Sequence, residues 1–174
     1  MKTLLKIVTV ISLAFVSSCD LFENSDDPKL PPITMDGRNT FGCLVNGIIW
    51  LPKGQSGSNG VFVDMTVPNF LSISADNEID NTGMSLVLND NKNFEVNKVY
   101  TLSNSKIYYA TYNYRTSHGI CFYEYQHVLT GKVLFSKLEN QLISGTFEFT
   151  TYNPDCGDTV KVKEGRFDIG NISH

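Results

Sequence analysis

Three cysteines in the body of the chain supply thiols that could form a cross-link. Cys43 lies in the apolar run "CLVNGIIW", where a thiol packs well as a small apolar group. Cys121 starts a predicted strand and Cys156 lies in the loop "NPDCGD", so a bond between these two distorts a regular core least. Three thiols allow one disulfide with one thiol left over. We predict a Cys121–Cys156 disulfide and a free, buried Cys43; the alternative is a chain without a disulfide.

Several residues near these cysteines are of types that bind metals. His118, Cys121, His127 and Cys156 could coordinate zinc, but their spacing matches no zinc finger or knuckle. The stretch "NDNKNFE", Asn89 to Glu95, lacks the central glycine and the carboxylates of a calcium loop, and an Asn/Asp turn explains it better. We therefore predict no metal site and no other cofactor.

Catalytic motifs are missing from the sequence. It contains no Gly-x-Ser-x-Gly elbow, no His-Glu-x-x-His motif and no glycine-rich nucleotide loop beside a predicted helix. Two carboxylates brought together by the fold could still serve a glycosidase. The acids open to such a role are Asp64, Asp76, Asp80, Asp155 and Asp158. We predict a protein that is not an enzyme, with a small hydrolase as an alternative.

An aromatic stretch, "IYYATYNYRTSHGICFYEY", predicts a hairpin that could bind a ligand. Alternation places Tyr108, Tyr112 and Tyr114 on one face of its first strand. The other face carries Ile107, Tyr109 and Thr111. Exposed tyrosines can stack on sugar rings or grip a partner. The predicted binding face is therefore Tyr108, Tyr112 and Tyr114, with Arg115 at its tip; the alternative is that tyrosine merely suits half-buried strands.

A fourth cysteine, Cys19, follows a segment with the layout of a secretory signal. Lys2 and Lys6 precede and interrupt an apolar run, Leu4 to Val16, that is shorter than the roughly 20 residues of a bilayer-spanning helix. Val16-Ser17-Ser18-Cys19 resembles the bacterial lipobox, whose cysteine is acylated and becomes the new N-terminus. Stable anchoring takes more than one acyl chain. We predict a signal peptide over 1–18 and lipidation of Cys19; the alternative is an ordinary signal peptide cut elsewhere.

Residues 19–40 are predicted to be a flexible acidic tether, because their few apolar side chains cannot offset the entropy of ordering. The acids Glu23, Asp26 and Asp27 are similar to the surface-export signals of Bacteroidetes lipoproteins, whereas Asp20 would mean inner-membrane retention under the enterobacterial rule. We expect an exported protein anchored in the outer membrane, at the cell surface or the periplasmic face. Removing the signal and its two lysines takes the net charge from -4 to -6, which argues against nucleic acid.

Residues 41–174 predict one all-β domain. Asn46-Gly47 separates two apolar runs as a type I′ turn, which sets Cys43 opposite Trp50 and Val45 opposite Ile48. Both faces of this hairpin are apolar, so we expect it at the centre of the fold. Short alternating segments follow and predict an antiparallel sandwich or barrel of about ten strands. These segments are Val61–Val67, Phe70–Ala75, Gly83–Leu88, Lys98–Leu102, Lys106–Tyr114, Ile120–His127, Lys132–Leu138, Ile143–Thr151, Thr159–Lys163 and Arg166–Ile169.

The last strands also predict a register. In "SGTFEFTTY" and "DTVKVKEGRFDI", large apolar residues alternate with polar ones. Pairing Phe149 with Val160 sets Glu148 opposite Lys161, a cross-strand charge pair worth a few tenths of a kcal/mol.

Two segments carry a family resemblance. "NTFGCLVNGIIWLP" from Asn39 and "ISGTFEFTTYNPDCGDTVKVKEGRFDI" to Ile169 resemble the two ends of small Bacteroidetes lipoproteins with a C-terminal domain of unknown function. The resemblance implies a β fold and an envelope location, and no activity or binding residues. We expect a membrane-anchored, non-catalytic binding module for a glycan or envelope protein; the alternatives are a structural envelope component and a small hydrolase.

Overall fold

The computed structural model describes residues 28–54, 59–65, 69–90, 92–139 and 141–172. The predicted signal peptide and Cys19 lie outside these ranges. No helix within them is long and apolar enough to cross a bilayer. The elements are β1 (Thr40–Val45), β2 (Ile48–Trp50), β3 (Val61–Asp64), β4 (Phe70–Asn77), β5 (Thr82–Asn89), β6 (Val99–Leu102), β7 (Tyr108–Thr116), β8 (Gly119–Tyr123), the 3-10 turn η1 (Tyr125–His127), β9 (Val128–Glu139), β10 (Leu142–Asn153) and β11 (Asp158–Gly170).

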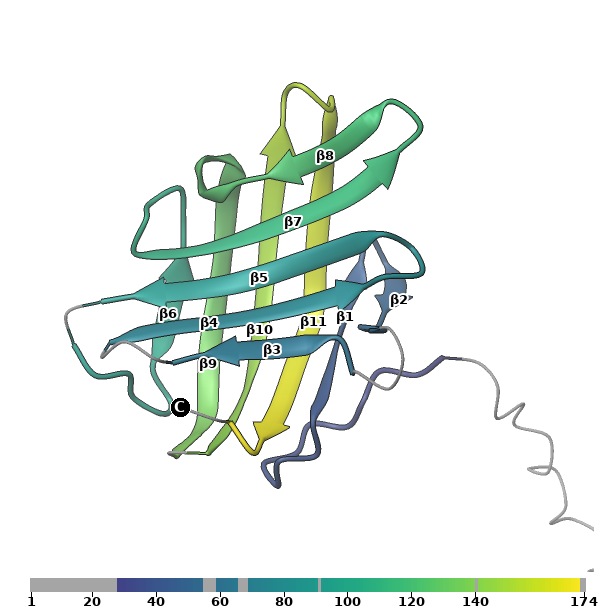
Figure 1. The fold of residues 1–174 in the computed structure, drawn as a ribbon. Helices are drawn as coiled ribbons and strands as arrows, with labels where there is room; N and C mark the ends of the chain where they lie inside the picture. Colours follow the sequence, from purple (N-terminus) through teal and green to yellow (C-terminus); the bar gives the residue numbers. More distant parts are fainter. Residues whose placement is uncertain (1–27, 55–58, 66–68, 91, 140, 173–174) are drawn as a thin grey trace, which may run out of the picture.

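The strands form two antiparallel sheets packed face to face. A six-stranded sheet has the order β2-β1-β11-β10-β9-β6, and a five-stranded sheet has the order β3-β4-β5-β7-β8. In Figure 1 the five-stranded sheet lies in front and its strands run across those of the sheet behind, which is the orthogonal type of sheet packing. Both sheets end in edge strands, so the fold is a sandwich and not a closed barrel. The predicted all-β fold is confirmed.

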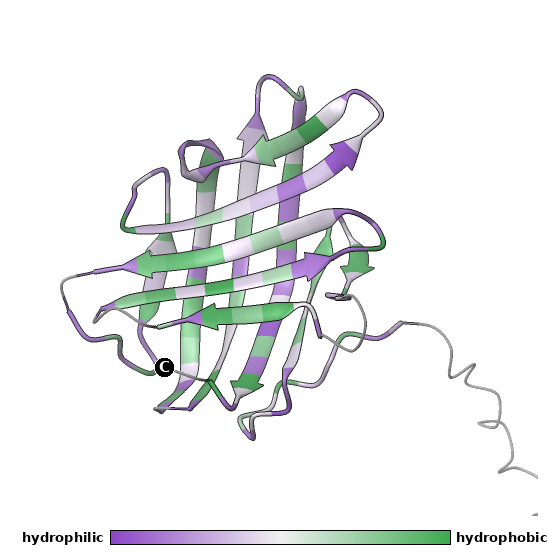
Figure 2. Cartoon of the chain, in the orientation of Figure 1, coloured by the Kyte–Doolittle hydropathy of each residue, from purple (hydrophilic) through white to green (hydrophobic). Residues whose placement is uncertain are grey.

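Alternation of residue types builds the core between the sheets. Along β4, Leu71, Ile73 and Ala75 are buried, whereas the serines between them and Asp76 are half-buried on the other face. Figure 2 shows the same alternation of hydrophobic and hydrophilic residues along β11. The inward residues of both sheets meet in one cluster, and burying one large apolar side chain stabilises a fold by roughly 1.5–3 kcal/mol.

The first hairpin has the predicted register but not the predicted place. Cys43 pairs with Trp50 and Val45 with Ile48, and both Asn46 and Gly47 have positive φ. The expectation of a central hairpin is wrong, because β1 continues the sheet through β11 while β2 is its edge strand. Ile48 is accordingly 74% exposed.

The C-terminal pair corrects a second expectation. Phe149 pairs with Val162 and not with Val160, because the hairpin that joins the two strands closes at the pair Asn153–Asp158, which sets a register two residues away from the predicted one. Glu148 therefore forms ion pairs with Lys163, at 3.2 Å, and with Lys132 of β9, at 3.5 Å. The two strands predicted on either side of Glu164 form one strand, β11, in which Glu164 has a positive φ.

The segment that precedes β1 is bound to the domain through Asp168. This carboxylate is 1% exposed and accepts hydrogen bonds from the hydroxyls of Thr34, at 2.6 Å, and Ser144, at 2.7 Å. The backbone N–H groups of Asp36, Gly37 and Arg38 also donate to it. The stretch that the sequence assigns to a flexible tether is thus held against β11 from Thr34 onwards.

Candidate ligand-binding site

The predicted Cys121–Cys156 disulfide is present and ties β8 to the loop between β10 and β11. The two Cα atoms are 6.0 Å apart, within the usual range for a disulfide. Cys43 is free and buried, and burial raises the pKa of its thiol to about 12. Cys43 is therefore an inert core residue rather than a reactive thiol.

No metal centre forms among the residues that the structure describes. Nowhere in those ranges do three or more His, Cys, Asp or Glu side chains gather closely enough to hold an ion. Of the four residues weighed for zinc, the two cysteines are joined in the disulfide. The His127 ring instead accepts a hydrogen bond from the backbone N–H of Glu124, at 3.1 Å.

The tyrosines predicted to form an exposed binding row point into the sandwich. Tyr112 is 5% exposed, and Tyr108 and Tyr114 pack against the core cluster. The Tyr108 hydroxyl donates to Asp90, and that of Tyr114 donates to Asp158 at 3.0 Å. The predicted binding face is therefore wrong, because these rings lie between the sheets.

The environment of these tyrosines explains their role. Burial raises the pKa of Tyr112 to about 12, and burial together with the hydrogen bond to Asp90 raises that of Tyr108 to about 12. Asp158 also accepts from the hydroxyl of Tyr123. The hydroxyls thus satisfy carboxylates at the ends of the core while the rings fill its interior, which is the usual place of a buried tyrosine.

Arg115 lies on the opposite face of β7 from the tyrosine row. Side chains alternate along a strand, so Tyr109, Thr111, Asn113 and Arg115 share the outer face of the five-stranded sheet. Arg115 is exposed there and reaches a cleft that the sequence did not predict.

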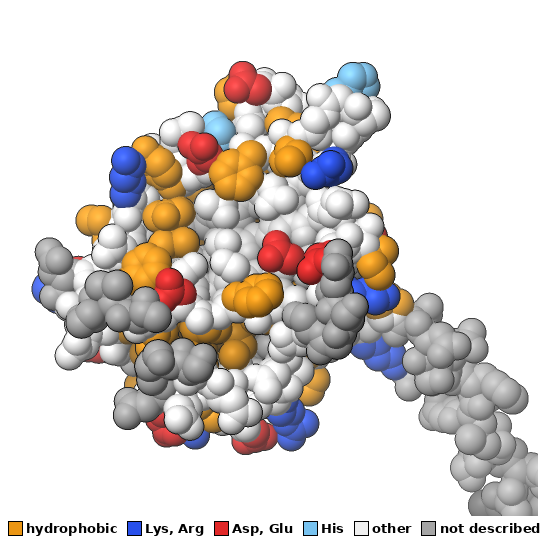
Figure 3. All heavy atoms as spheres, viewed as in Figure 1, with side chains coloured by type: hydrophobic (Ala, Val, Ile, Leu, Met, Phe, Trp, Pro, Cys, Tyr) orange, Lys and Arg blue, Asp and Glu red, His pale blue; other side chains and the backbone are white. Residues whose placement is uncertain are grey.

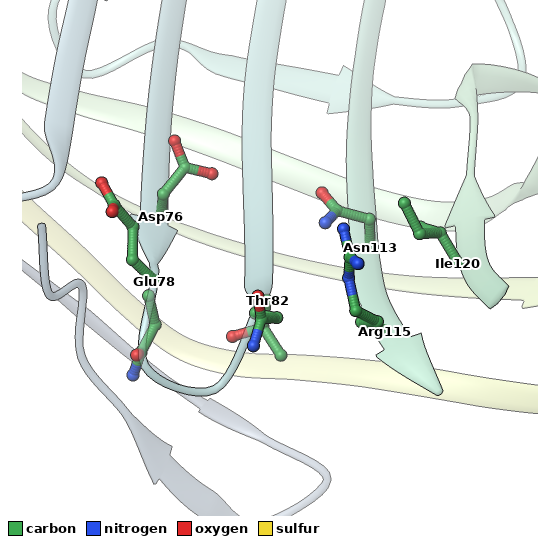
Figure 4. Close-up of a pocket in the computed structure, with 8 residues that line it drawn as sticks. Asp76, Glu78, Thr82, Asn113, Arg115 and Ile120 are labelled. Atoms are coloured by element: carbon green, nitrogen blue, oxygen red, sulfur yellow. The ribbon is translucent and has the colours of Figure 1, made fainter. Parts of the chain in front are cut away.

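This cleft is open to solvent where β4 turns into β5, and it has a volume of about 280 Å³. Figure 4 shows Asp76 of β4 and Glu78 of the following turn on one side, and Asn113 and Arg115 of β7 on the other. Thr82 of β5 lies between the two sides. The full lining is Asp76, Asn77, Glu78, Asn81, Thr82, Asn113, Arg115 and Ile120.

Two lining residues of the cleft, Asp76 and Asn113, belong to a row of four residues in cross-strand register that ends at the rim. Asp76 pairs with Gly83, Gly83 with Asn113, and Asn113 with Phe122. A Cβ atom at Gly83 would clash with Oδ1 of Asp76 and lie 3.0 Å from Oδ1 of Asn113. The carboxylate and the amide therefore lean over the glycine from both sides, and the missing side chain lets them converge.

The charged side chains of the cleft take no part in the ion pairs of the described residues. None of Asp76, Glu78 and Arg115 forms an ion pair within the described ranges. Partial burial, and then the neighbouring Glu78, raise the pKa of Asp76 above its usual value. In contrast, Asp80 accepts a hydrogen bond from Asn77 at 3.0 Å and Asp158 accepts from two tyrosines, so those acids have structural roles.

Exposed apolar side chains border the cleft. Ile120 and Phe122 of β8 lie beside Arg115 and Asn113, with which they pair, and are 59% and 45% exposed. Phe62 of β3 is 58% exposed and ends the next row, in which it pairs with Ser74. Figure 3 shows acidic side chains in the middle of this face, with hydrophobic side chains above and below them.

Sequence reasoning identified part of this site. It named Asp76 among the acids that the fold could bring together, and Arg115 as a binding residue, but it missed Gly83, Asn113 and Phe122. The alternation along residues 107–115 predicts two faces of one strand, and it placed Thr111 and Tyr109 on the face that is now seen to be outside. Nothing local to that strand indicates which face the second sheet covers.

Comparisons with known proteins assign the chain to a family but give no activity. Neither the curated proteins nor the solved structures include a match to this chain. A family model described as a domain of unknown function (DUF6252) matches residues 58–169. That range includes the second of the two segments on which the resemblance rests and also every residue that lines the cleft. The chain belongs to the DUF6252 family of domains of unknown function.

Proposed function

We propose that this protein is an exported, lipid-anchored, non-catalytic binding module, and that the cleft on the outer face of its five-stranded sheet holds a glycan or another envelope component. One observation carries the proposal. Asp76, Asn113 and Arg115 converge with an exposed apolar rim on a face where the charged groups have no ion-pair partner within the described ranges.

The character of this face supports binding. A ligand site combines apolar contact area with a few convergent polar groups that fix orientation. The rim supplies the area through Phe122 and Ile120, and the cleft supplies a carboxylate, an amide and a guanidinium. The Cys121–Cys156 disulfide supports export, because disulfides persist in oxidising compartments.

A small hydrolase is the second candidate, since Asp76 and Glu78 provide two carboxylates and the pKa of Asp76 is raised, as in a general acid. A glycosidase needs its two carboxyl groups on either side of the scissile bond. Figure 4 shows both acids on the same side of the cleft, opposite Asn113 and Arg115. The geometry favours binding over hydrolysis.

Retention on envelope material tests the proposal. The full chain, purified in detergent, is passed over immobilised cell envelopes of the bacterium that encodes it. Arg115→Ala and Phe122→Ala should each weaken retention about tenfold or more, because they remove a charged donor and a stacking surface. Both should melt close to wild type, since exposed substitutions shift stability by roughly 0.5 kcal/mol or less.

Tyr152→Ala is the matched control, because Tyr152 is an exposed aromatic residue of β10 in the other sheet. It should be retained as the wild type is. Unchanged retention of both cleft variants would contradict the proposal.

A further inference from the structure

We infer that the cleft takes a carbohydrate, bound with its ring across the cross-strand row Asp76–Gly83–Asn113–Phe122, and that Gly83 sets the depth of the sugar subsite. This inference rests on the proposed function and names the ligand class of the same site.

The groups of this row match the surface of a sugar. Each sugar hydroxyl can donate one hydrogen bond and accept others, and the carboxylate of Asp76 is an acceptor of high capacity. The Asn113 amide both donates and accepts, and the Arg115 guanidinium donates only. The carboxylate and the amide converge over Gly83. They can therefore form hydrogen bonds with neighbouring hydroxyls of one sugar ring from two sides.

The next group in the row provides an apolar platform. Phe122 pairs with Asn113 and is 45% exposed. Adjacent strands are about 4.8 Å apart, so the ring begins one strand spacing from the amide. The apolar C–H face of a pyranose can stack on such a ring while its hydroxyl edge points to the polar groups.

The neighbouring row extends the same chemistry. Ser74, Ser85 and Thr111 lie in register across β4, β5 and β7, with the exposed ring of Phe62 at their end. The hydroxyls of Ser74 and Ser85 share a hydrogen bond of 2.9 Å, and this polar row beside the ring of Phe62 suits an extended glycan that passes beyond the cleft.

Other ligand classes suit the cleft less well. A phosphate or nucleic acid would meet two carboxylates and one guanidinium, and an acyl chain would meet a lining in which Ile120 is the apolar member. A peptide strand adds to the edge of a sheet, whereas this row crosses the interior strands β5 and β7.

Two substitutions in the cross-strand row test the inference. In Gly83→Ala the new methyl group clashes with the mobile end of Asp76 and not with backbone, so the fold tolerates it while the carboxylate is pushed out of place. Asp76→Asn keeps the shape and removes the charge. Each should weaken glycan binding about tenfold or more, in line with the loss of a charge-assisted hydrogen bond.

The experiment uses the full chain in detergent and affinity electrophoresis through gels that contain β-glucan, mannan, xylan or chitin oligosaccharides. We expect at least one neutral polysaccharide to retard the wild type and the control Asp36→Asn, whose exposed carboxylate lies on the segment before β1. Gly83→Ala and Asp76→Asn should migrate as they do without polysaccharide, with unchanged melting temperatures.

Three results overturn the inference. They are no retardation of the wild type by any of these polysaccharides, equal retardation of wild type and both variants, and envelope retention that survives periodate oxidation of sugar diols. In the last case the cleft binds an envelope component that is not a carbohydrate. The proposed function is then kept and the carbohydrate inference is rejected. If the wild type binds neither the polysaccharides nor the envelope material, the proposed function is rejected as well.

Discussion

Asp168 is a buried carboxylate that joins the segment before β1 to the sheet through neutral hydrogen-bond donors. Its oxygens accept five hydrogen bonds, from Thr34, Asp36, Gly37, Arg38 and Ser144. A buried charge is costly unless such bonds satisfy it. The sequence offers only "GRFDI" at this position, which is why the residue reads as an ordinary strand aspartate until its partners are seen.

Replacing Asp168 should release the segment before β1. In Asp168→Asn one oxygen becomes an NH2 group that faces backbone N–H donors, so we expect a loss of about 2–4 kcal/mol in the free energy of unfolding. Urea denaturation measures it. Asp36→Asn, at an exposed ion pair with Arg38, is the control and should change stability by less than about 0.5 kcal/mol; an equal effect of both variants would count against this role of Asp168.

Asp168 also predicts how stability depends on pH. Although burial opposes ionisation, its hydrogen bonds lower the pKa of this carboxyl from 3.8 to about 2. Between these values the unfolded state binds more protons than the folded state, so stability rises with pH in this window. About 2 kcal/mol should be present above pH 4 and lost as the pH falls through 2.

Urea melts at pH 2, 3, 4 and 6 check this dependence. The wild type should show the rise between pH 2 and 4, and Asp168→Asn should show a flatter profile there. A variant with the same slope as the wild type would assign the acid sensitivity to other carboxylates.

At the scale of elements, β8 is an edge strand that is tied to the other sheet. It pairs with β7 at the edge of the five-stranded sheet, and the Cys121–Cys156 disulfide links it to the β10–β11 loop. The Nδ2 group of Asn153 in β10 adds a hydrogen bond to the backbone oxygen of Phe122, at 2.9 Å. These links hold Ile120 and Phe122 at the rim of the cleft.

Breaking the disulfide should therefore affect both stability and binding. The cysteines are 35 residues apart, and the chain-entropy relation gives a loss of about 3–4 kcal/mol for such a loop. Reductant should lower the melting temperature of the wild type and leave that of the double variant Cys121→Ser, Cys156→Ser unchanged. Non-reducing peptide mapping completes the test, and recovery of a peptide that joins Cys43 to either partner would refute the pairing.

At the scale of the whole molecule, the cleft and the predicted anchor belong to different parts of the chain. The cleft lies on the five-stranded sheet, whereas the segment that leads towards Cys19 is bound to β11 of the other sheet. We expect that an anchor at Cys19, reached through a segment bound to β11, leaves the cleft accessible to large ligands.

Lipidation of Cys19 stays a prediction with a direct test. Cys19→Ser should abolish incorporation of labelled palmitate and shift the protein from the detergent phase to the aqueous phase, because a chain without acyl groups lacks a stable anchor. Ser18→Ala keeps the small residue before the cysteine and should label as wild type does. Labelling of the Cys19→Ser variant would reject the anchor.

The sequence alone determined the features that depend on local chemistry. Period-two alternation predicted most strands, Asn46-Gly47 predicted the first turn and its register, and the loop position of Cys156 predicted the disulfide. Each of these follows from the φ preferences, side-chain direction or covalent reach of neighbouring residues, which the rest of the fold does not alter.

The tertiary structure alone decided which faces are buried and which residues meet. Alternation separates Tyr112 from Asn113, but packing of the second sheet buries the tyrosine and leaves the asparagine half-buried on the outer face. The cross-strand row beside the cleft joins Asp76, Gly83, Asn113 and Phe122 from four strands, and its register depends on turns between them. The hairpin between β10 and β11 places Glu148 beside Lys163 and not Lys161, because the length of the connecting loop sets the register of both strands.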